Sequence, residues 1–442
     1  MQANLRLGLA GLGTVGVSVM RLLAKHGDEL AERCGRRVQV RSVCARDRSR
    51  DRGVDLAGVN WFQDPVKLAQ DPNIDVFVEL MGGAGGAAEA SVRAALNAGK
   101  HVVTANKALL AAHGVELARL AEERGVSLNF EAAVAGGIPI IKTLREALAG
   151  NQVSRVAGIL NGTCNYMLTR MEKEGLSFDA CLAEAQRLGY AEADPSFDID
   201  GHDTAHKLAL LASLAFGTEI NAAPDALRVE GITRITSADI QAADELGYRI
   251  KLLGIAEKTA AGVEQRVHPT MVPKSSAIAR IDGVINAVAI DADFVNKLLL
   301  VGPGAGGDAT ASSVVGDIAD IARGTWLTTM GRPATKMKPS VPPNAASVAA
   351  GFFVRLAVFD RPGAFAAIAT RMAERAISLE SIVQRARAPR ADAPTAHDKI
   401  APQPVILITY ETTEAELKGA LDQILADGHV AEMPRYIRIE TF

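Results

Sequence analysis

Short apolar runs alternate with amphipathic segments over the first third of the chain. The predicted strands are residues 5–10, 38–44, 74–80, 101–107 and 127–134, and helical spacing of apolar residues follows at 17–26 and 87–98. Nearly continuous apolar strands that alternate with helices are typical of a parallel sheet covered on both faces. The pattern predicts a Rossmann-like, doubly wound α/β domain over residues 1–130.

The middle of the chain has a different pattern. A strand at 155–161 is followed by a helix from 162 and by predicted helices at 178–188, 204–216 and 237–246. The β-rich runs are 250–257, 263–271 and 284–290. Strands that follow one another with few helices between them predict an antiparallel sheet behind the site, in a catalytic and dimerisation domain over 131–330. A helix at 309–322 is expected to return to the first domain, which residues 302–328 would complete.

The last quarter reads as a separate small domain. Residues 331–350 are rich in Pro, Lys and Ala and are predicted to be a linker. Beyond it, strands are predicted at 352–359, 377–384, 405–411 and 435–440, with helices at 364–375 and 413–427. This order, βαββαβ over 351–442, is that of a ferredoxin-like domain. Residues 385–402 are expected to form a mobile hairpin loop.

Composition excludes several classes of partner. The 442 residues include 48 Lys and Arg against 51 Asp and Glu, so the charge does not favour nucleic acid or a membrane surface. No apolar run reaches the about 20 residues of a membrane span, and the first residues lead directly into a strand, without room for a signal peptide. The cysteines, Cys34, Cys44, Cys164 and Cys181, lack metal-like spacing and are expected to be reduced. We expect a cytoplasmic protein.

A glycine turn between the first strand and the first helix favours a dinucleotide. The turn GLGTVG spans Gly11, Gly13, Thr14, Val15 and Gly16. Glycines at these positions let the backbone approach a pyrophosphate, which rests on the helix N-terminus. A glycine-rich turn without a ligand is the alternative, because the motif alone is weak.

The ends of the next strands predict the rest of a cofactor cleft. Arg46 follows the second strand, where an acidic residue would bind the ribose of NAD, so NADP is favoured and NAD remains possible. Arg50 and Arg52 are expected in a solvated loop. Thr104, Ala105 and Lys107 lie at the carboxyl end of another strand, the edge at which parallel sheets bind ligands.

An acidic loop leads from Gly189 into the helix at 204–216. Its carboxylates are Glu192, Asp194, Asp198, Asp200 and Asp203. The helix is apolar nearly all round, as buried helices are. We expect Asp203 to cap this helix and Lys207 to lean back toward the loop. A buried lysine beside carboxylates favours a functional site, and a surface ion pair is the alternative.

Two further glycine-rich segments have weaker signals. Glu131 precedes a bend through Ile138, and a carboxylate beside carbonyls freed by a tight bend is a plausible seat for a monovalent cation. Residues 301–310 form a second glycine-rich helix start, which would cover the cofactor or form a plain loop.

Several of these segments resemble homoserine dehydrogenases. The run 185–207 matches that family's signature, and further matches are GLGTVG at 11–16, TANK at 104–107, GILNGT at 158–163 and GPGAG at 302–306. The terminal domain, with Asp-Arg-Pro-Gly at 360–363, is similar to a regulatory ACT domain. Cys164 stands where relatives often have Thr or Ser.

The resemblance implies roles for individual residues. It implies reversible NAD(P)-dependent reduction of L-aspartate 4-semialdehyde to L-homoserine, in threonine and methionine biosynthesis. Lys207 and Lys107 would be catalytic; Glu192, Asp198 and Asp203 would bind the substrate; and Gly189 and Gly306 would line the cofactor. Glu131 with the carbonyls of Val134, Gly136 and Ile138 would hold sodium. Threonine would be the feedback inhibitor of a homodimer or homotetramer.

Two alternative functions would require chemistry different from this NAD(P)-dependent reduction. An aldehyde dehydrogenase that forms an acyl phosphate needs a cysteine nucleophile beside a histidine, and Cys164 is the only cysteine near the predicted site. A regulator that binds NADP and an amino acid without catalysis is the other alternative, and it would not consume NADPH.

Overall fold

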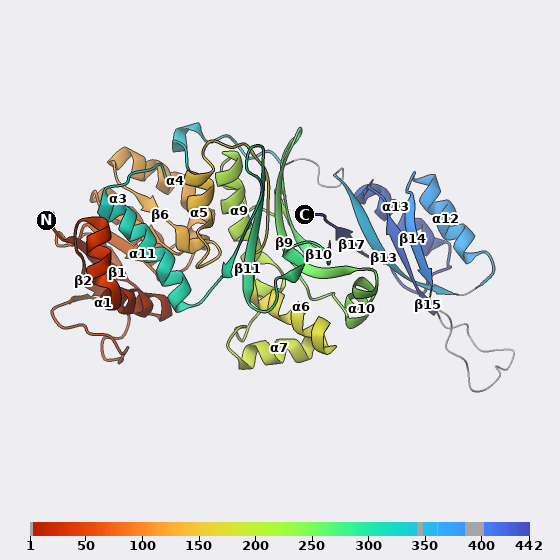
Figure 1. The fold of residues 1–442 in the computed structure, drawn as a ribbon, viewed down its shortest axis with the longest axis horizontal. Helices are drawn as coiled ribbons and strands as arrows, with labels where there is room; N and C mark the ends of the chain where they lie inside the picture. Colours follow the sequence, from red (N-terminus) through yellow and green to blue (C-terminus); the bar gives the residue numbers. More distant parts are fainter. Residues whose placement is uncertain (1–2, 343–347, 360, 385–401) are drawn as a thin grey trace.

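The computed structural model describes residues 3–342, 348–359, 361–384 and 402–442. Three parts follow one another along its longest axis (Figure 1): an amino-terminal sheet with its helices, a second sheet, and a carboxyl-terminal module. None of the helices in the described ranges combines the length and apolar character that a membrane crossing requires. All four cysteines are buried and unpaired.

The first sheet has six parallel strands in the order β3-β2-β1-β4-β5-β6, as in Rossmann domains. The strands are β1 (Leu5–Ala10), β2 (Val38–Cys44), β3 (Asn60–Phe62), β4 (Val76–Glu79), β5 (His101–Thr104) and β6 (Leu128–Asn129). The Rossmann-like prediction is therefore confirmed. The predicted strand at 127–134 is shorter than expected, because the chain turns at Phe130 into a 3-10 helix, η1 (Glu131–Ala133).

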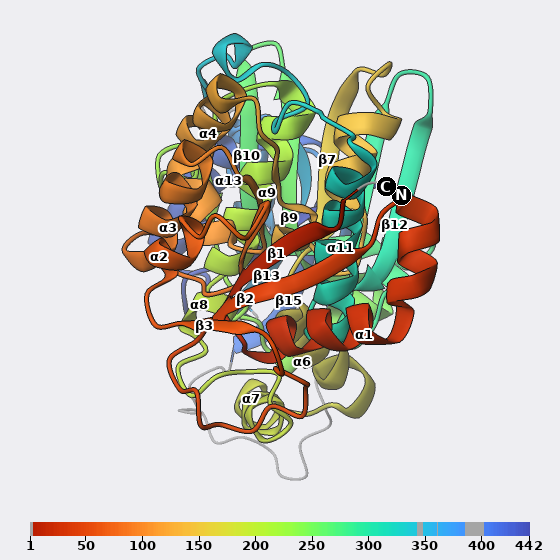
Figure 2. The same cartoon turned by 90° about the vertical axis from the view of Figure 1, so that its left-hand side faces the viewer.

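Helices cover both faces of this sheet. They are α1 (Thr14–Cys34), α2 (Pro65–Ala69), α3 (Ala87–Asn97), α4 (Lys107–Arg124) and α11 (Gly307–Arg323). Helix α1 continues past the predicted end at His26, where it kinks, because Leu30 and Cys34 still pack on the core. It ends at Gly35, which has φ 72°. Helix α11, although distant in sequence, packs along α1 (Figure 2).

The second sheet is antiparallel in its catalytic half, as predicted. It contains β7 (Val153–Ile159), β9 (Tyr248–Thr259), β10 (Gly262–Pro273), β11 (Ile285–Ala292) and β12 (Asn296–Pro303), in the order β12-β11-β7-β9-β10. The short β8 (Leu227–Val229) pairs in parallel with β10. The sequence did not predict β12, which ends at the glycine-rich segment before α11.

Five helices accompany this sheet: α6 (Gly162–Glu174), α7 (Phe178–Arg187), α8 (Ser196–Ile199), α9 (His202–Phe216) and α10 (Ser237–Glu245). Helix α9 packs between α4 of the first part and strands β7, β9 and β10 of the second (Figure 1). It joins the two halves, so its first turn lies where they meet. This position explains its apolar composition.

The start of α9 corrects one prediction. Asp203 does not cap the helix, because the helix begins at His202 and its N-cap is Gly201. Gly201 has φ 90°, which favours glycine, and a side chain there would press on Val229 and Val267. Asp203 thus lies inside the first turn, where its carboxylate is free to bind other side chains.

The terminal module confirms the predicted βαββαβ order. Its elements are β13 (Ala349–Phe359), α12 (Ala364–Glu374), β14 (Leu379–Gln384), β15 (Pro402–Thr409), β16 (Thr412–Thr413), α13 (Glu414–Ala426) and β17 (Arg435–Ile439). Its strands are ordered β17-β13-β15-β14, and β17 pairs with β10, so one sheet runs through both parts. The predicted loop at 385–402, apart from its last residue, and Asp360 of the predicted turn lie outside the described residues.

The predicted linker is partly structured. A 3-10 turn, η4 (Ala334–Lys336), packs on α4, and the backbone N–H of Ala334 donates to both carboxylate oxygens of Glu122, at 3.0 and 2.9 Å. Residues 343–347 of this linker are outside the described ranges.

Candidate active site

The glycine turn before α1 has the geometry of a pyrophosphate cradle. A Cβ on Gly11, which has φ 110°, would lie 2.5 Å from the Leu80 carbonyl oxygen, and one on Gly16 would lie 2.1 Å from the Gly11 carbonyl oxygen. At Gly13, apart from its chain neighbours, no atom of the described residues lies within 4 Å of that position. Gly11 and Gly16 therefore permit close packing, whereas Gly13 leaves the backbone open to a ligand. Thr14 and Val15 begin the helix.

The second glycine-rich turn adjoins the first. Gly306, with φ 108°, precedes α11, and a Cβ on Gly307 would lie 2.8 Å from Cγ2 of Thr14 and 2.7 Å from Oγ of Ser18. The starts of α1 and α11 are therefore side by side. No atom lies within 4 Å of a Cβ on Gly306, so this turn is open as well.

A buried carboxylate that the sequence analysis missed organises the edge of the first sheet. Glu79 ends β4, is fully buried, and accepts hydrogen bonds from the Thr104 hydroxyl (2.7 Å) and the Met81 N–H (2.7 Å). The Thr104 side chain thus points to the neighbouring strand, and Ala105 follows it at the edge. An acidic residue that ends an otherwise apolar strand was the available signal.

The arginines after β2 lie in two different environments, and one of them was predicted wrongly. Arg46 is exposed just beyond the strand end. Arg52, expected in solvent, donates to the Leu12 carbonyl (3.2 Å) and lies over the Trp61 ring at 5.5 Å. The expectation for Arg52 was wrong, because this long side chain returns to the glycine turn and holds the loop against it.

Asp203 lies between two lysines at the junction of the two halves. Lys207 Nζ donates to Asp203 Oδ2 (2.7 Å) and to the Leu160 carbonyl (2.7 Å). Lys107, the first residue of α4, places Nζ 3.1 Å from Asp203 Oδ1. Asp203 and Lys207 are 5% and 9% exposed, so water does little to screen this pair. The structure thus brings together three of the residues predicted for the site.

Asn161 connects this centre to the acidic loop. Its side-chain N–H groups donate to Asp203 Oδ2 (2.9 Å) and Asp198 Oδ1 (2.8 Å), and its oxygen caps α6 through the Cys164 N–H (2.8 Å). The Cys164 thiol donates to the Asp198 carbonyl (3.2 Å). Four residues from two distant segments therefore form one hydrogen-bonded unit, in which Asn161 was not predicted.

Within this unit, burial and the neighbouring positive charges have opposite effects on the pKa of Asp203. Burial on its own would raise the pKa of Asp203, but Lys207 and Lys107 together with the bonds from Lys207 and Asn161 hold that pKa well below its usual value. Burial, and then the charge of Asp203, raise the pKa of Asp198. Burial also raises the pKa of the Cys164 thiol well above its usual range. Asp203 is therefore the ionised partner of both lysines.

Two predicted residues lie apart from this unit. Glu192 is exposed, and its carboxylate makes no hydrogen bond or ion pair within the described residues. Gly189, with φ 74°, donates its N–H to Gln186 at the end of α7. Both belong to the loop that precedes α8, beside the unit in sequence but not joined to it.

His206 is a second residue that the sequence analysis missed. It is half-buried, its Nδ1 has no partner among the described residues, and its ring meets Phe197 edge to face at 5.4 Å. Burial and the charge of Lys107 lower its pKa. A neutral imidazole therefore stands next to the lysines, and its position directly before Lys207 was the only sequence signal.

The bend predicted to hold a cation contains a buried carboxylate. Both oxygens of Glu131 accept backbone N–H groups, from Ile141 and Lys142, each at 2.8 Å. Burial, and then the charge of Asp317, raise the pKa of Glu131 to about 7. Ala135 and Gly136 have φ 54° and 49°, so the backbone turns sharply here. The Gly136 carbonyl accepts from the Ser313 hydroxyl (2.7 Å).

The arrangement suits hydride chemistry at a carbonyl better than thiol chemistry. Two ammonium groups oriented by one carboxylate can stabilise and protonate an oxygen on which negative charge develops. Cys164 is fully buried and its pKa is raised, so a nucleophilic thiolate is disfavoured. Cys164 is therefore unsuited to be the nucleophile of the alternative reaction that forms an acyl phosphate.

Comparison with known proteins gives consistent matches along the chain. The family model of the homoserine dehydrogenase NAD binding domain matches residues 11–131, and that of homoserine dehydrogenase matches residues 139–319. The homoserine dehydrogenase of Neisseria gonorrhoeae is 42% identical over 442 residues, which cover 98% of each chain. That of Pseudomonas aeruginosa is 43% identical over 443 residues, with the same coverage.

Solved structures agree with these matches. A homoserine dehydrogenase from Thiobacillus denitrificans matches with a TM-score of 0.91 and 40% identity, covering 99% of this chain and 98% of that one. A hyperthermophilic archaeal homoserine dehydrogenase in complex with NADPH matches with a TM-score of 0.61 and 26% identity, covering 74% of this chain and 99% of that one.

Proposed function

The chain belongs to the homoserine dehydrogenase family, and on this premise we propose which of its residues carry out the reaction. The family is one of NAD(P)-dependent oxidoreductases of amino-acid biosynthesis, which interconvert L-aspartate 4-semialdehyde and L-homoserine. The observation that carries the assignment is the Asp203 carboxylate between Lys107 and Lys207. It lies where the Rossmann half and the second sheet meet through α4 and α9.

Lys207 is the proton donor in this proposal. An ammonium group has three N–H donors, and two of those of Lys207 are taken by Leu160 and Asp203. The third remains for the aldehyde oxygen of the substrate. When bound, NADPH would supply a hydride to the aldehyde carbon. The Lys207 ammonium group would then donate a proton to the oxygen, on which negative charge develops.

Lys107 stabilises the same oxygen from the nicotinamide side. Its side chain is 32% exposed and has one contact to Asp203, so two of its N–H donors are unused among the described residues. Asp203 orients both lysines and, with Asp198 and Glu192, binds the hydroxyl and ammonium ends of the substrate. Glu192 is exposed in the structure and would need to turn inward.

The test is loss of NADPH absorbance with L-aspartate 4-semialdehyde. Lys207→Ala is expected to bind NADPH normally and to lose about 10² to 10⁴ in kcat, the contribution typical of a general acid. Lys258→Ala, which removes an exposed lysine near the end of β9, is the matched control and should turn over normally. A kcat of Lys207→Ala within threefold of wild type would contradict the role. A wild type that binds NADPH but never consumes it would favour the non-catalytic regulator.

The cofactor is proposed to be NADP, with NAD as a weaker substrate. The open turns at Gly13 and Gly306 fit a pyrophosphate, and Gly189 is proposed to line the same cofactor. Arg46, exposed beyond β2, would pair with the 2′-phosphate. Arg46→Ala should raise KM for NADPH about tenfold or more and leave KM for NADH unchanged. Equal effects on both cofactors would refute the assignment.

A sodium ion is proposed at the bend of Glu131, Val134, Gly136 and Ile138. The sharp turn and the burial of the Glu131 and Asp317 carboxylates, which raises the pKa of both although Lys142 lies 3.6 Å from Asp317, support a cation there. Both carboxylate oxygens of Glu131 already accept N–H groups, so carbonyl oxygens would provide most ligands. Thermal unfolding in sodium chloride against choline chloride tests this: sodium should raise Tm, and an equal Tm would contradict the site.

The terminal module is proposed to be an ACT-type regulatory domain that senses threonine. The strand order β17-β13-β15-β14 and the two helices support it. We also propose a homodimer or homotetramer, formed through the second sheet. Inhibition of turnover by threonine, and light scattering of the full chain, are the two measurements. A monomer that threonine does not inhibit would contradict both.

A further inference from the structure

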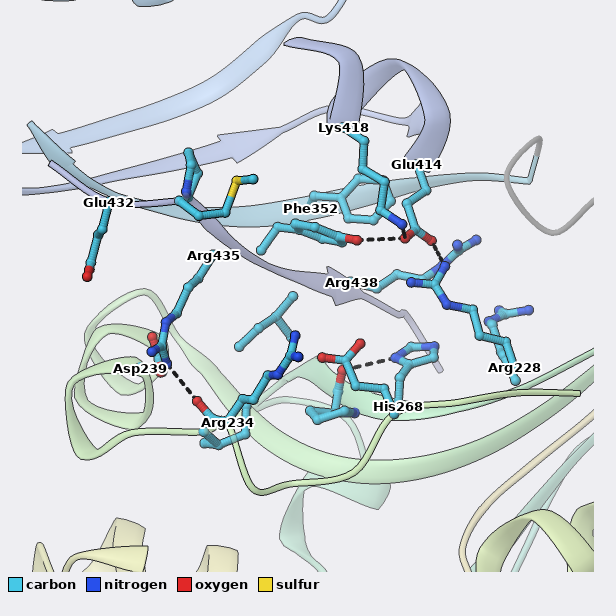
Figure 3. Close-up of a pocket in the computed structure, with 18 of the residues that line it drawn as sticks. Arg228, Arg234, Asp239, His268, Phe352, Glu414, Lys418, Glu432, Arg435 and Arg438 are labelled. Atoms are coloured by element: carbon cyan, nitrogen blue, oxygen red, sulfur yellow. Dashed lines mark hydrogen bonds and ion pairs between the residues drawn. The ribbon is translucent and has the colours of Figure 1, made fainter. Parts of the chain in front are cut away.

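A cavity of about 630 Å³ separates the second sheet from the terminal module (Figure 3). Strands β8 and β10 and the start of α10 form one wall, and β13, β17 and α13 form the other. Alternate residues of paired strands point into it, among them Arg228, Glu230, Arg266, His268 and Arg438. The hydrogen-bonded residues around Asp203, described above, do not line this cavity.

Two hydrogen-bond acceptors of the cavity are unpaired. Glu230 is half-buried, and its carboxylate makes no hydrogen bond or ion pair among the described residues. Burial raises its pKa, and the charges of Arg228 and Arg234 only partly offset this rise. His268 Nδ1 lies 2.9 Å from the Pro269 carbonyl oxygen, which can only accept, and 3.1 Å from the Thr270 hydroxyl, which donates to the His268 carbonyl (3.1 Å). These contacts favour the tautomer with the proton on Nδ1. Burial, and then the charge of Arg266, lower the pKa of His268 to about 4. Its Nε2 is therefore a buried acceptor that has no donor among the residues that the structure describes.

These two acceptors are neighbours. Arg228 pairs with Arg266 and Val229 with Val267 in the parallel β8–β10 ladder, and the N–H of Glu230 donates to the Val267 carbonyl at 2.7 Å. Glu230 thus stands beside His268 on the same face of the sheet. A carboxylate and a bare imidazole nitrogen at one place are suited to an ammonium group.

Two donors of the same cavity are also unpaired. Arg234 is exposed into it without an ion pair within the described ranges, and Arg266 Nε is buried without an acceptor. The other nitrogens of Arg266 pair with Glu264 and Glu440, and one of them lies 3.7 Å from Glu257. Glu414, by contrast, is satisfied by Arg228, Lys418 and Tyr436. Guanidinium groups with unused N–H donors are suited to a carboxylate.

We propose that this cavity binds a free α-amino acid, with its ammonium group on Glu230 and His268 and its carboxylate on Arg234 and Arg266. The proposal rests on the regulatory function proposed above and gives it a site. A simple anion would face Glu230, and a simple amine would face the arginines, so a ligand that carries both charges fits this wall of the cavity better than either.

The segment that carries Glu230 also reaches the catalytic loop. The Ile232 N–H donates to the Ile199 carbonyl at 2.8 Å, and a Cβ on Gly231 would lie 2.1 Å from that carbonyl oxygen. Ile199 lies between Asp198 and Gly201, directly before α9. An amino acid that draws Glu230 toward the cavity therefore acts on the backbone that positions Asp198 and Asp203, which links binding to turnover.

Isothermal titration of the full chain tests the site. The standard amino acids are first compared by thermal shift, beginning with L-threonine. The tightest ligand is then titrated beside its amino alcohol, which lacks the carboxylate, and its hydroxy acid, which lacks the ammonium group. Both analogues should bind at least about tenfold more weakly, because each loses a charge-assisted contact.

Variants locate the ligand. Glu230→Gln and Arg234→Gln should each weaken binding by about tenfold or more, whereas Glu411→Gln, at an exposed carboxylate of the terminal module, should bind as wild type does. Unfolding curves check that each variant is folded. Unchanged affinity in both cavity variants would overturn this site and leave amino-acid regulation standing. A wild type that no amino acid stabilises would overturn the regulatory function itself.

Discussion

Replacing Asp203 by Asn tests the centre of the site most directly. The substitution keeps the shape of the side chain but removes the charge that Lys207 (2.7 Å) and Lys107 (3.1 Å) share. Removing one partner of a buried ion pair costs about 3 to 5 kcal/mol. Lys107 is 32% exposed, so water can solvate its ammonium group when the contact with Asp203 is lost. Lys107 therefore contributes little to the loss of stability. The amide oxygen still accepts one hydrogen bond, so we expect a loss near the lower limit, about 3 kcal/mol.

The assay is thermal unfolding of wild type and variant, with NADPH turnover measured in parallel. A loss of about 3 kcal/mol corresponds to a Tm lower by about 6 to 12 °C for a cooperative unit of 150 to 250 residues. Glu192→Gln is the control for stability, since Glu192 is exposed and makes no ion pair within the described residues. Asp203→Asn should cost slightly less in a Lys107→Met background, because one of the two ammonium groups that the change leaves without a carboxylate is then absent; the reduction is small since Lys107 is 32% exposed.

The lowered pKa of Asp203 predicts how the difference in Tm between wild type and Asp203→Asn changes with pH. The folded-state pKa of Asp203 is lowered, so its stabilisation is fully present above the unfolded value of about 3.9 and is lost as pH falls through the folded value. The difference in Tm between wild type and Asp203→Asn should be constant from pH 5 to 9 and shrink below pH 4. A Tm difference under 1 °C at pH 7, or one that grows in acid, would refute the reasoning.

Three other substitutions separate packing from function. Gly13→Ala should fold as wild type does but bind NADPH at least about tenfold more weakly, by fluorescence titration, because its Cβ meets no protein atom; normal binding would place the cofactor elsewhere. Gly16→Ala should instead lower Tm, since its Cβ would lie 2.1 Å from the Gly11 carbonyl oxygen, and an unchanged Tm would contradict that packing. Cys164→Ser should keep kcat within about threefold, because a hydroxyl can donate to the Asp198 carbonyl as the thiol does. In the native protein Cys164 should resist thiol reagents at pH 8, since its pKa is raised, and rapid labelling would contradict its burial.

The parts of the fold that local pattern determines could be predicted from the sequence. Apolar strands, helical spacing and the glycine turn at residues 11–16 depend on neighbours within a few positions, and the Rossmann sheet and the βαββαβ order followed from them. Lys207 and Asp203 were also within reach, because a spacing of four places both on one side of a helix. The prediction that Asp203 caps the helix was wrong, because Gly201 allows the helix to begin two residues before the predicted start.

The remaining features depend on contacts between distant segments. Asn161 binds Asp198 and Asp203, which follow it by 37 and 42 residues, and no spacing rule indicates such a contact. Glu79 binds Thr104 only because β4 and β5 are adjacent. Arg52 looked like a solvated residue because charged loops usually are, and only the path of the loop brings it to Leu12.

The pairing of β17 with β10 has a consequence for how far this chain can be shortened. The archaeal homoserine dehydrogenase bound to NADPH is nearly fully covered by 74% of this chain, so some relatives are smaller. In this chain, Thr270 and Met271 of β10 pair with Arg438 and Ile439, and the Glu440 N–H donates to the Met271 carbonyl. Truncation before residue 348 would uncover these backbone groups as an open strand edge, which is a template for self-association. A truncated enzyme would therefore need a charged or proline residue placed on that edge to remain dispersed in solution.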